Sequence, residues 1–246
     1  MVNKITSRII ALIFCSGLMA QDSPIVNSAS YSKVYKGKEA AFEKAVSSHV
    51  SEWHGEGQWN QFGSRVMTGP RAGQYFIGTT GHYWKDYDNR VTTDAHDEDW
   101  ARINNRFVEE SSGQNYFVRN LDASYNDRRS PMWRIQYFYC KPAGVRDMVG
   151  ILKKIRAANE DAKYERSYGI FHLVASGRNA VLADVTRMDG MADMGPANSR
   201  LRERWAAKYG DEASFEDAVN TWLNSYTHSE TEIHQLVEGM TTPPSN

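Results

Sequence analysis

His82 and His172 of this 246-residue chain lie in predicted strands, where an imidazole could perform acid–base chemistry near neutral pH. His82 lies near the end of the strand predicted at residues 73–84. His172 lies in a nearly apolar stretch, residues 170–173, where a buried imidazole would need a hydrogen-bond partner. We therefore take His82 and His172 as candidate catalytic residues, with a purely structural role as the alternative for each.

Strand alternation suggests which side chains accompany these histidines. Ala183 and its neighbours two residues away are small and apolar, so we expect them to be covered by helices. Matching the two halves of the chain then places His82 on the side of a cavity. The predicted ligand-binding residues on the same side are Trp84, Thr80, Phe76 and Asp184.

The sequence lacks the motifs that would indicate a metal site, a phosphate-binding loop or a serine nucleophile. The histidines and carboxylates at 52–56 and 228–234 do not have the H-E-x-x-H spacing that places two imidazoles on one helix face. We expect these to be solvated loop residues, with His49 a helix–sheet contact, and we predict no metal site. A glycine-rich phosphate loop and a G-x-S-x-G nucleophile elbow are also missing from the sequence.

The elements that would position these residues follow one plan twice. Apolar periodicity and turn residues predict the order β-α-β-β-α-β in both halves. In the first half the ranges are 31–35, 40–53, 64–68, 73–84, a helix containing Trp100 and Phe107, and 116–121. In the second half they are 133–139, 145–158, 167–175, 179–186, helical sequence from 201 to 223, and 233–237.

This repeat, with a glycine in the central hairpin of each half and an aromatic-rich strand after Gly73, resembles the dimeric α+β barrel superfamily in a tandem-fused form. The resemblance covers residues 28–238, with halves at 28–125 and 130–238. It implies an α+β fold in which two ferredoxin-like antiparallel sheets face each other. The superfamily includes cofactor-free monooxygenases, chlorite dismutase-like haem proteins, stress-responsive proteins and some lyases, so fold alone does not select a reaction.

The two ends of the chain differ from the rest. Residues 1–20 combine Lys4 and Arg8 with an apolar stretch, which is typical of a signal peptide cleaved near Ala20, and they predict an exported protein. No other stretch is long and apolar enough for a transmembrane helix. We expect residues 239–246 to be a disordered tail.

Composition narrows the function classes. The 29 basic and 30 acidic residues nearly cancel, which argues against a nucleic-acid partner. The chain is 12% aromatic, which suits a pocket for a small molecule or a glycan. We expect an exported small-ligand-binding barrel protein, and one form of this expectation is an enzyme of the cofactor-independent monooxygenase type that uses a barrel histidine as acid or base. A haem-binding barrel, a polysaccharide lyase, a non-catalytic envelope or stress protein, and a homo-oligomer remain open.

Overall fold

The computed structural model describes residues 24–55, 58–175, 180–195, 200–210 and 212–244. The predicted signal peptide, residues 1–20, lies outside the described part of the chain.

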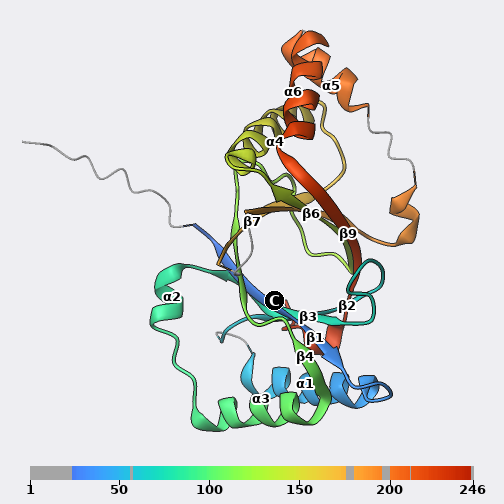
Figure 1. Cartoon of the computed structure of the whole chain (residues 1–246). Helices are drawn as coiled ribbons and strands as arrows, with labels where there is room; N and C mark the ends of the chain where they lie inside the picture. The colour runs from blue at the N-terminus through green and yellow to red at the C-terminus, as the bar shows by residue number, and fades with distance from the viewer. Residues whose placement is uncertain (1–23, 56–57, 176–179, 196–199, 211, 245–246) are drawn as a thin grey trace, which may run out of the picture.

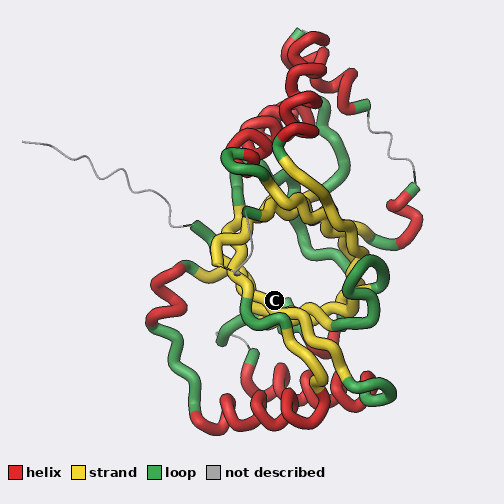
Figure 2. Tube along the Cα trace, in the orientation of Figure 1, coloured by secondary structure: helices red, strands yellow, loops and turns green. Residues whose placement is uncertain are grey.

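Eight antiparallel strands close into a barrel (Figures 1 and 2). Around the barrel the order is β3-β2-β9-β6-β8-β7-β5-β1, and the pairing of β1 with β3 closes the ring. A short additional strand, β4 (Val108–Ser111), pairs with the end of β1. The eight barrel strands are β1 (Val26–Val34), β2 (Gln61–Val66), β3 (Tyr75–His82), β5 (Asn115–Arg119), β6 (Met132–Cys140), β7 (Tyr168–Ala175), β8 (Val181–Met188) and β9 (Tyr226–Leu236).

The two halves of the chain are joined by hydrogen bonds at two seams. Strand β2 of the first half pairs with β9 of the second, and β5 of the first half pairs with β7 of the second. Each seam satisfies strand edges that an isolated half would leave unpaired. One chain therefore completes the barrel without a second copy.

Helices cover the barrel on two opposite sides (Figure 1). On one side, α1 (Glu39–Trp53) and α3 (Asp94–Phe107) pack against β1 and β3 through an apolar cluster that includes Phe42, Tyr75 and Ile103. On the other, α4 (Gly144–Asp161) covers β6, β7 and β8 through Met148 and Leu152. Helices α5 (Leu201–Tyr209) and α6 (Glu212–Asn224) pack on α4.

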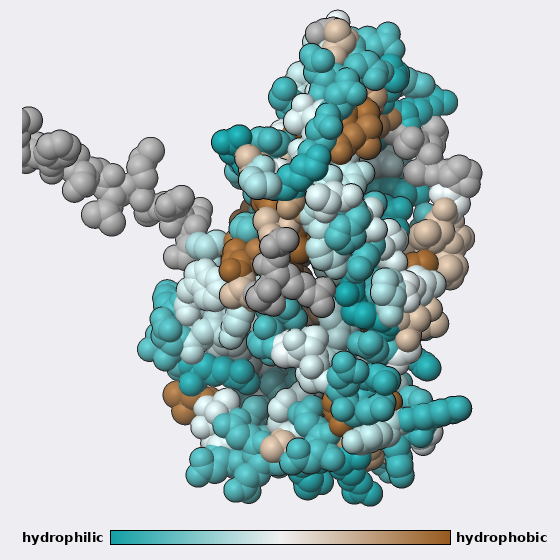
Figure 3. Space-filling view, viewed as in Figure 1, coloured by the Kyte–Doolittle hydropathy of each residue, from teal (hydrophilic) through white to brown (hydrophobic). Residues whose placement is uncertain are grey.

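The predicted α+β class and the order of elements are confirmed. The structure adds α2 (Trp84–Asp88), β4, and the short 3₁₀ helices η1 (Met191–Met194) and η2 (Glu238–Met240). Among the described residues, no helix combines the length and apolarity needed to cross a membrane. The face shown in Figure 3 is mainly hydrophilic, with small separate hydrophobic patches.

The predicted disorder of residues 239–246 is wrong for residues 239–242. Met240 is fully buried, and its side chain occupies the space above Gly63 of β2. The hydroxyls of Thr241 and Thr242 accept hydrogen bonds from the backbone N–H groups of Gly63 and Gln61. Residues 241 and 242 are held in place because they satisfy donors at the β2 edge, which the polar tail sequence did not indicate.

The pairing of β1 with β3 that closes the barrel depends on Gly78. A Cβ at this position would collide with the backbone oxygen of Ser28 and lie 2.6 Å from the Ala29 Cβ. We expect Gly78→Ala to lower the free energy of unfolding by about 3 kcal/mol, the upper end for overpacking, because backbone atoms must move. Chemical denaturation would measure the change.

The matched control is Gly150→Ala on the exposed side of α4, where a Cβ would meet no atom within 4 Å among the described residues. This change should stabilise by about 0.5–1 kcal/mol through helix propensity. Equal effects of the two substitutions would contradict the proposed closure.

Candidate functional site

A cavity of about 470 Å³ occupies the barrel interior and opens at one end. Its volume lies within the range usual for small-molecule sites, about 300–1,000 Å³. Its wall is aromatic and aliphatic, with contributions from strands of both halves. The apolar lining includes Phe62, Phe76, Phe117, Trp133, Ile135, Phe171, Ala183, Val185 and Leu236.

The open end of the cavity is strongly basic. Its lining contains four arginines, Arg119, Arg128, Arg129 and Arg187, and a single carboxylate, Asp127. Asp127 bridges two of them, at 2.8 Å from Arg119 Nη2 and 2.6 Å from Arg187 Nε. Arg128 pairs with Asp189 outside the lining. The excess positive charge favours a ligand with an anionic group at this end.

The cavity meets a buried polar network at Tyr137. The Tyr137 hydroxyl lies 2.7 Å from the Tyr31 hydroxyl, which donates to Glu232 Oε2 at 2.9 Å. Glu232 also accepts from His234 Nε2 at 3.1 Å and pairs with Arg71 Nε at 2.7 Å. Glu232 and His234 are fully buried. A hydrogen-bonded path therefore leads from the cavity to a buried carboxylate.

Burial and charge set the protonation states of this network. Burial alone would raise the pKa of Glu232, but hydrogen bonds from His234 and Tyr31 and the Arg71 charge bring it below its ordinary value. Burial lowers the pKa of His234 and raises the pKa of both Tyr31 and Tyr137. At neutral pH the resting network thus holds an ionised Glu232 paired with Arg71⁺, with the imidazole and both phenols neutral.

The barrel geometry is shared with known structures. A candidate monooxygenase from Lactobacillus acidophilus NCFM aligns over 90% of this chain and 96% of its own, with a TM-score of 0.57 and 7% identity. An anthrone oxidase-like protein aligns over 89% and 93%, with a TM-score of 0.55 and 10% identity. Chlorite dismutase from Candidatus Nitrospira defluvii aligns over 90% and 95%, with a TM-score of 0.52 and 8% identity.

This chain has the dimeric α+β barrel fold. At these identities the likeness shows the fold alone. No family model and no curated protein matches the sequence.

Within this dimeric α+β barrel, the predicted site residues of the first half fall into two groups. Those before Gly81 line the cavity, and those after it do not. Phe76 and Thr80 line the cavity as predicted. Gly81 has φ of +82°, and the β1–β3 register shifts there, so alternation does not continue to His82. Instead His82 stacks on Trp59 with ring centroids 3.8 Å apart, and Trp84 begins α2, half-exposed. Placing His82 and Trp84 on the cavity side was wrong.

The face prediction for β8 was also wrong. Ala183 and Val185 line the cavity, whereas Leu182 packs beneath α4, so Asp184 lies on the outer face. The side chains of Ala183 and Val185 are small, and this leaves room for the cavity. His172 likewise points away from the barrel interior, at a separate surface pocket beside α4. The catalytic roles predicted for His82 and His172 remain untested.

The cavity's own polar groups are not among the predicted site residues. The expectation that Glu232 and His234 are solvated loop residues is wrong, because both are fully buried on β9. Arg128 and Arg129 lie in the linker between the two predicted halves and were not expected at a site. The alternation of Glu230, Glu232 and His234 along β9 was the available signal, because these residues share one face. The position of the linker arginines at the cavity had no sequence signal, since it depends on how the barrel closes.

The cavity does not fit the haem alternative. None of its lining residues is a histidine. Both ring nitrogens of the buried His234 are engaged, Nε2 by Glu232 and Nδ1 at 3.1 Å from Ser64 Oγ. The described residues therefore present no free imidazole to an iron in the cavity.

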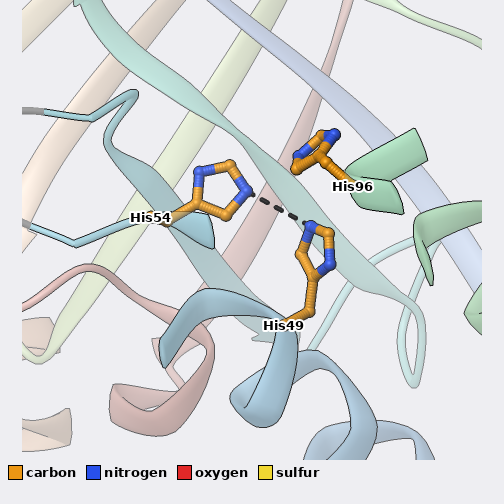
Figure 4. A group of neighbouring side chains, drawn as sticks. All are labelled: His49, His54 and His96. Atoms are coloured by element: carbon orange, nitrogen blue, oxygen red, sulfur yellow. Dashed lines mark hydrogen bonds between the residues drawn. The ribbon is translucent and has the colours of Figure 1, made fainter. Parts of the chain in front are cut away.

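A cluster of three histidines lies outside the barrel, between α1 and α3 (Figure 4). His49 comes from α1, His54 follows the end of α1, and His96 comes from the first turn of α3. One ring nitrogen of each lies within 4.8 Å of those of the other two. Burial lowers the pKa of His49 and lowers the pKa of His54 to about 4. This cluster contradicts the expectation that residues near His54 are solvated loop residues.

We expect acid to destabilise the protein. Burial lowers the native pKa of His234, His82 and His172, whereas the unfolded chain titrates near about 6.5. As pH falls through that value, the unfolded state binds more protons than the native state, so the free energy of unfolding decreases. Thermal melts at about pH 7.5 and about pH 5.5 should show a lower midpoint in acid, before carboxylates titrate.

His172→Leu provides the matched comparison. Its Nδ1 is buried without a hydrogen-bond partner among the described residues, so a leucine should be tolerated and should reduce the pH dependence. If the melting midpoint of the unmodified protein in acid equals or exceeds its midpoint at neutral pH, the assignment of lowered histidine pKa values is refuted.

Proposed function

We propose that the protein is an enzyme whose barrel cavity binds a flat, apolar small molecule with one anionic group. The observation that carries this proposal is the cavity's polarity: an aromatic wall, a basic mouth, and the lining residue Tyr137, whose hydroxyl is bonded to the buried network through Tyr31. The ligand's anionic group would face Arg129 and Arg187, while its rings contact Phe76, Phe171 and Trp133.

The hydrogen-bond directions favour proton removal from this ligand. Because Tyr31 donates its only hydroxyl proton to Glu232, Tyr137 donates to Tyr31. The Tyr137 oxygen then has lone pairs available to accept a proton from the ligand. Movement of one proton along each link would neutralise Glu232 and leave both phenols protonated. His234 and Arg71 hold the carboxylate in place, so they are positioning residues for this base.

The reaction that fits best is oxidation by O₂ without a cofactor. The ligand loses a proton through Tyr137 and the resulting anion supplies the electrons that reduce O₂. In balanced form, R₂CH₂ and O₂ give R₂C=O and H₂O: two C–H bonds break, one oxygen atom enters the product and the other leaves as water. The names of two structural neighbours, a candidate monooxygenase and an anthrone oxidase-like protein, support this class.

Tyr137→Phe tests the relay. We expect turnover to fall by about 10²–10⁴, the usual range for losing an acid–base group, while ligand affinity changes far less because the ring remains. Oxygen consumption and product mass, measured across a panel of acidic polycyclic phenols and anthrones, would report the activity. Quenching of Trp133 fluorescence would report binding.

The control is Tyr125→Phe, which removes a buried hydroxyl hydrogen-bonded to the Asn159 carbonyl on the α4 side of the sheet. It should leave turnover unchanged. Equal turnover by the Tyr137→Phe variant and the unmodified enzyme would reject the relay. Acidic oligosaccharides belong in the same panel: an unsaturated uronate product would identify a lyase instead.

We also propose that the protein is exported, on the basis of residues 1–20. Expression of the full chain in a bacterial host should give an envelope or secreted product whose first residue is near Gln21, as read by mass spectrometry of the intact protein. Replacing Ile9 and Leu12 with Asp should retain the chain in the cytosol with Met1 or Val2 at its start. An unmodified chain that keeps residues 1–20 in the cytosol would disprove export.

A further inference from the structure

The three histidines between α1 and α3 are arranged to share a ligand. His49 and His54 are buried and the His96 side chain is 12% exposed, so the cluster has one edge near solvent. Figure 4 shows the three rings converging from separate segments. Trp100 packs against His49, with ring centroids 5.0 Å apart. Solvent access is thus confined to the side of His96.

Each imidazole uses its Nδ1 for a hydrogen bond within the protein. His49 Nδ1 lies 2.8 Å from Asp99 Oδ2, His54 Nδ1 lies 2.7 Å from the Trp59 carbonyl oxygen, and His96 Nδ1 lies 2.8 Å from Asp97 Oδ1. All three partners are acceptors, so each Nδ1 carries the proton. In the neutral tautomer, each Nε2 then has a free lone pair.

The lone pairs of two rings face each other at short range. His49 Nε2 and His54 Nε2 are 3.3 Å apart, and neither neutral ring has a proton to place between them. Two nitrogens bound tetrahedrally to zinc at about 2.05 Å are separated by about 3.3–3.4 Å. A cation bound by both nitrogens would remove the repulsion between their lone pairs. The two Nε2 atoms already have the separation that such a cation requires.

We propose that His49, His54 and His96 bind a divalent transition-metal ion of the zinc class. Imidazole nitrogens suit this class, and Nδ1 bonds to carboxylate or carbonyl oxygens orient histidine ligands in known zinc sites. Three protein ligands leave a fourth position open for water or an anion. The Trp53 indole packs edge-on against His96, and its buried Nε1 lacks a partner among the described residues, so it is an available donor beside that position.

The metal would also hold one side of the cavity entrance. His54 is bonded to the Trp59 carbonyl, and the residues that follow, Asn60 and Gln61, line the cavity. The Trp59 ring stacks on His82. Binding at the three histidines would therefore hold His54 and the Trp59 carbonyl bonded to it against α3.

Zinc binding by the tag-free protein tests this proposal. After removal of metal by a chelator and dialysis, calorimetric titration with Zn²⁺ and elemental analysis should give one zinc per chain. We expect binding to weaken by more than about 100-fold in each of three variants, His49→Ala, His54→Ala and His96→Gln. This loss exceeds the range for residues that only orient a metal ligand. Co²⁺ should give the intense visible absorption of a four-coordinate site, and the variants should lose it.

His228→Gln, at an exposed histidine on β9, is the matched control and should bind zinc normally. His96→Gln keeps the test decisive, because its partly exposed site should allow a native circular dichroism spectrum even if the buried substitutions unfold the chain. The proposal is overturned if the unmodified chain binds less than about 0.1 zinc, or if folded His96→Gln binds zinc as tightly as the unmodified chain.

Asp99→Asn tests whether this carboxylate orients His49 for the metal. Asp99 accepts from His49 Nδ1 and also pairs with Arg102. Its amide replacement should weaken zinc affinity by about 10–100-fold with one zinc still bound at saturation. Unchanged affinity would show that His49 is not oriented for a metal by this carboxylate.

Discussion

The buried carboxylate of Glu232 organises the interior of the barrel. An ionised group without solvent is costly unless charges and hydrogen bonds surround it, and here Arg71, His234 and Tyr31 do so. These side chains come from different strands or from the turn before β3, so the barrel must close in one register for the charge to be satisfied. Their bulk fills the inner part of the barrel, and the remaining space is the cavity.

Fusion of two ferredoxin-like halves allows the two sides of this interior to differ. In a barrel made of identical chains, every interior residue would occur twice. Here β9 contributes Glu232 and His234, whereas β5, the last strand of the first half's plan, contributes Phe117 to the apolar wall. Likewise β3 presents the large Phe76 where β8 presents Ala183. One chain can thus combine a polar inner end with an apolar wall and a basic mouth.

The fold could be predicted from the sequence further than the site could. Apolar periodicity identified both β-α-β-β-α-β plans because it is a local property of each element. Which strand face lines the cavity also depends on bulges and on the space left inside the barrel. The face predicted for His82 is therefore wrong because of the irregularity at Gly81, and the face predicted for the small side chains of β8 is wrong because they border the cavity. The three-histidine cluster combines residues from α1 and α3 that are over forty positions apart. Their contact follows from helix packing, which spacing within one element does not encode.

The position of residues 241–244 has a practical consequence for work with this protein. Thr241 and Thr242 are bonded to the edge of β2, and Pro243 and Pro244 belong to the cavity lining. Residues 241–244 are thus part of the wall of the cavity. A bulky reporter attached to these residues would lie beside the cavity, and their removal would take away part of its lining. Labels for ligand screening belong on the surface around α5 and α6 instead.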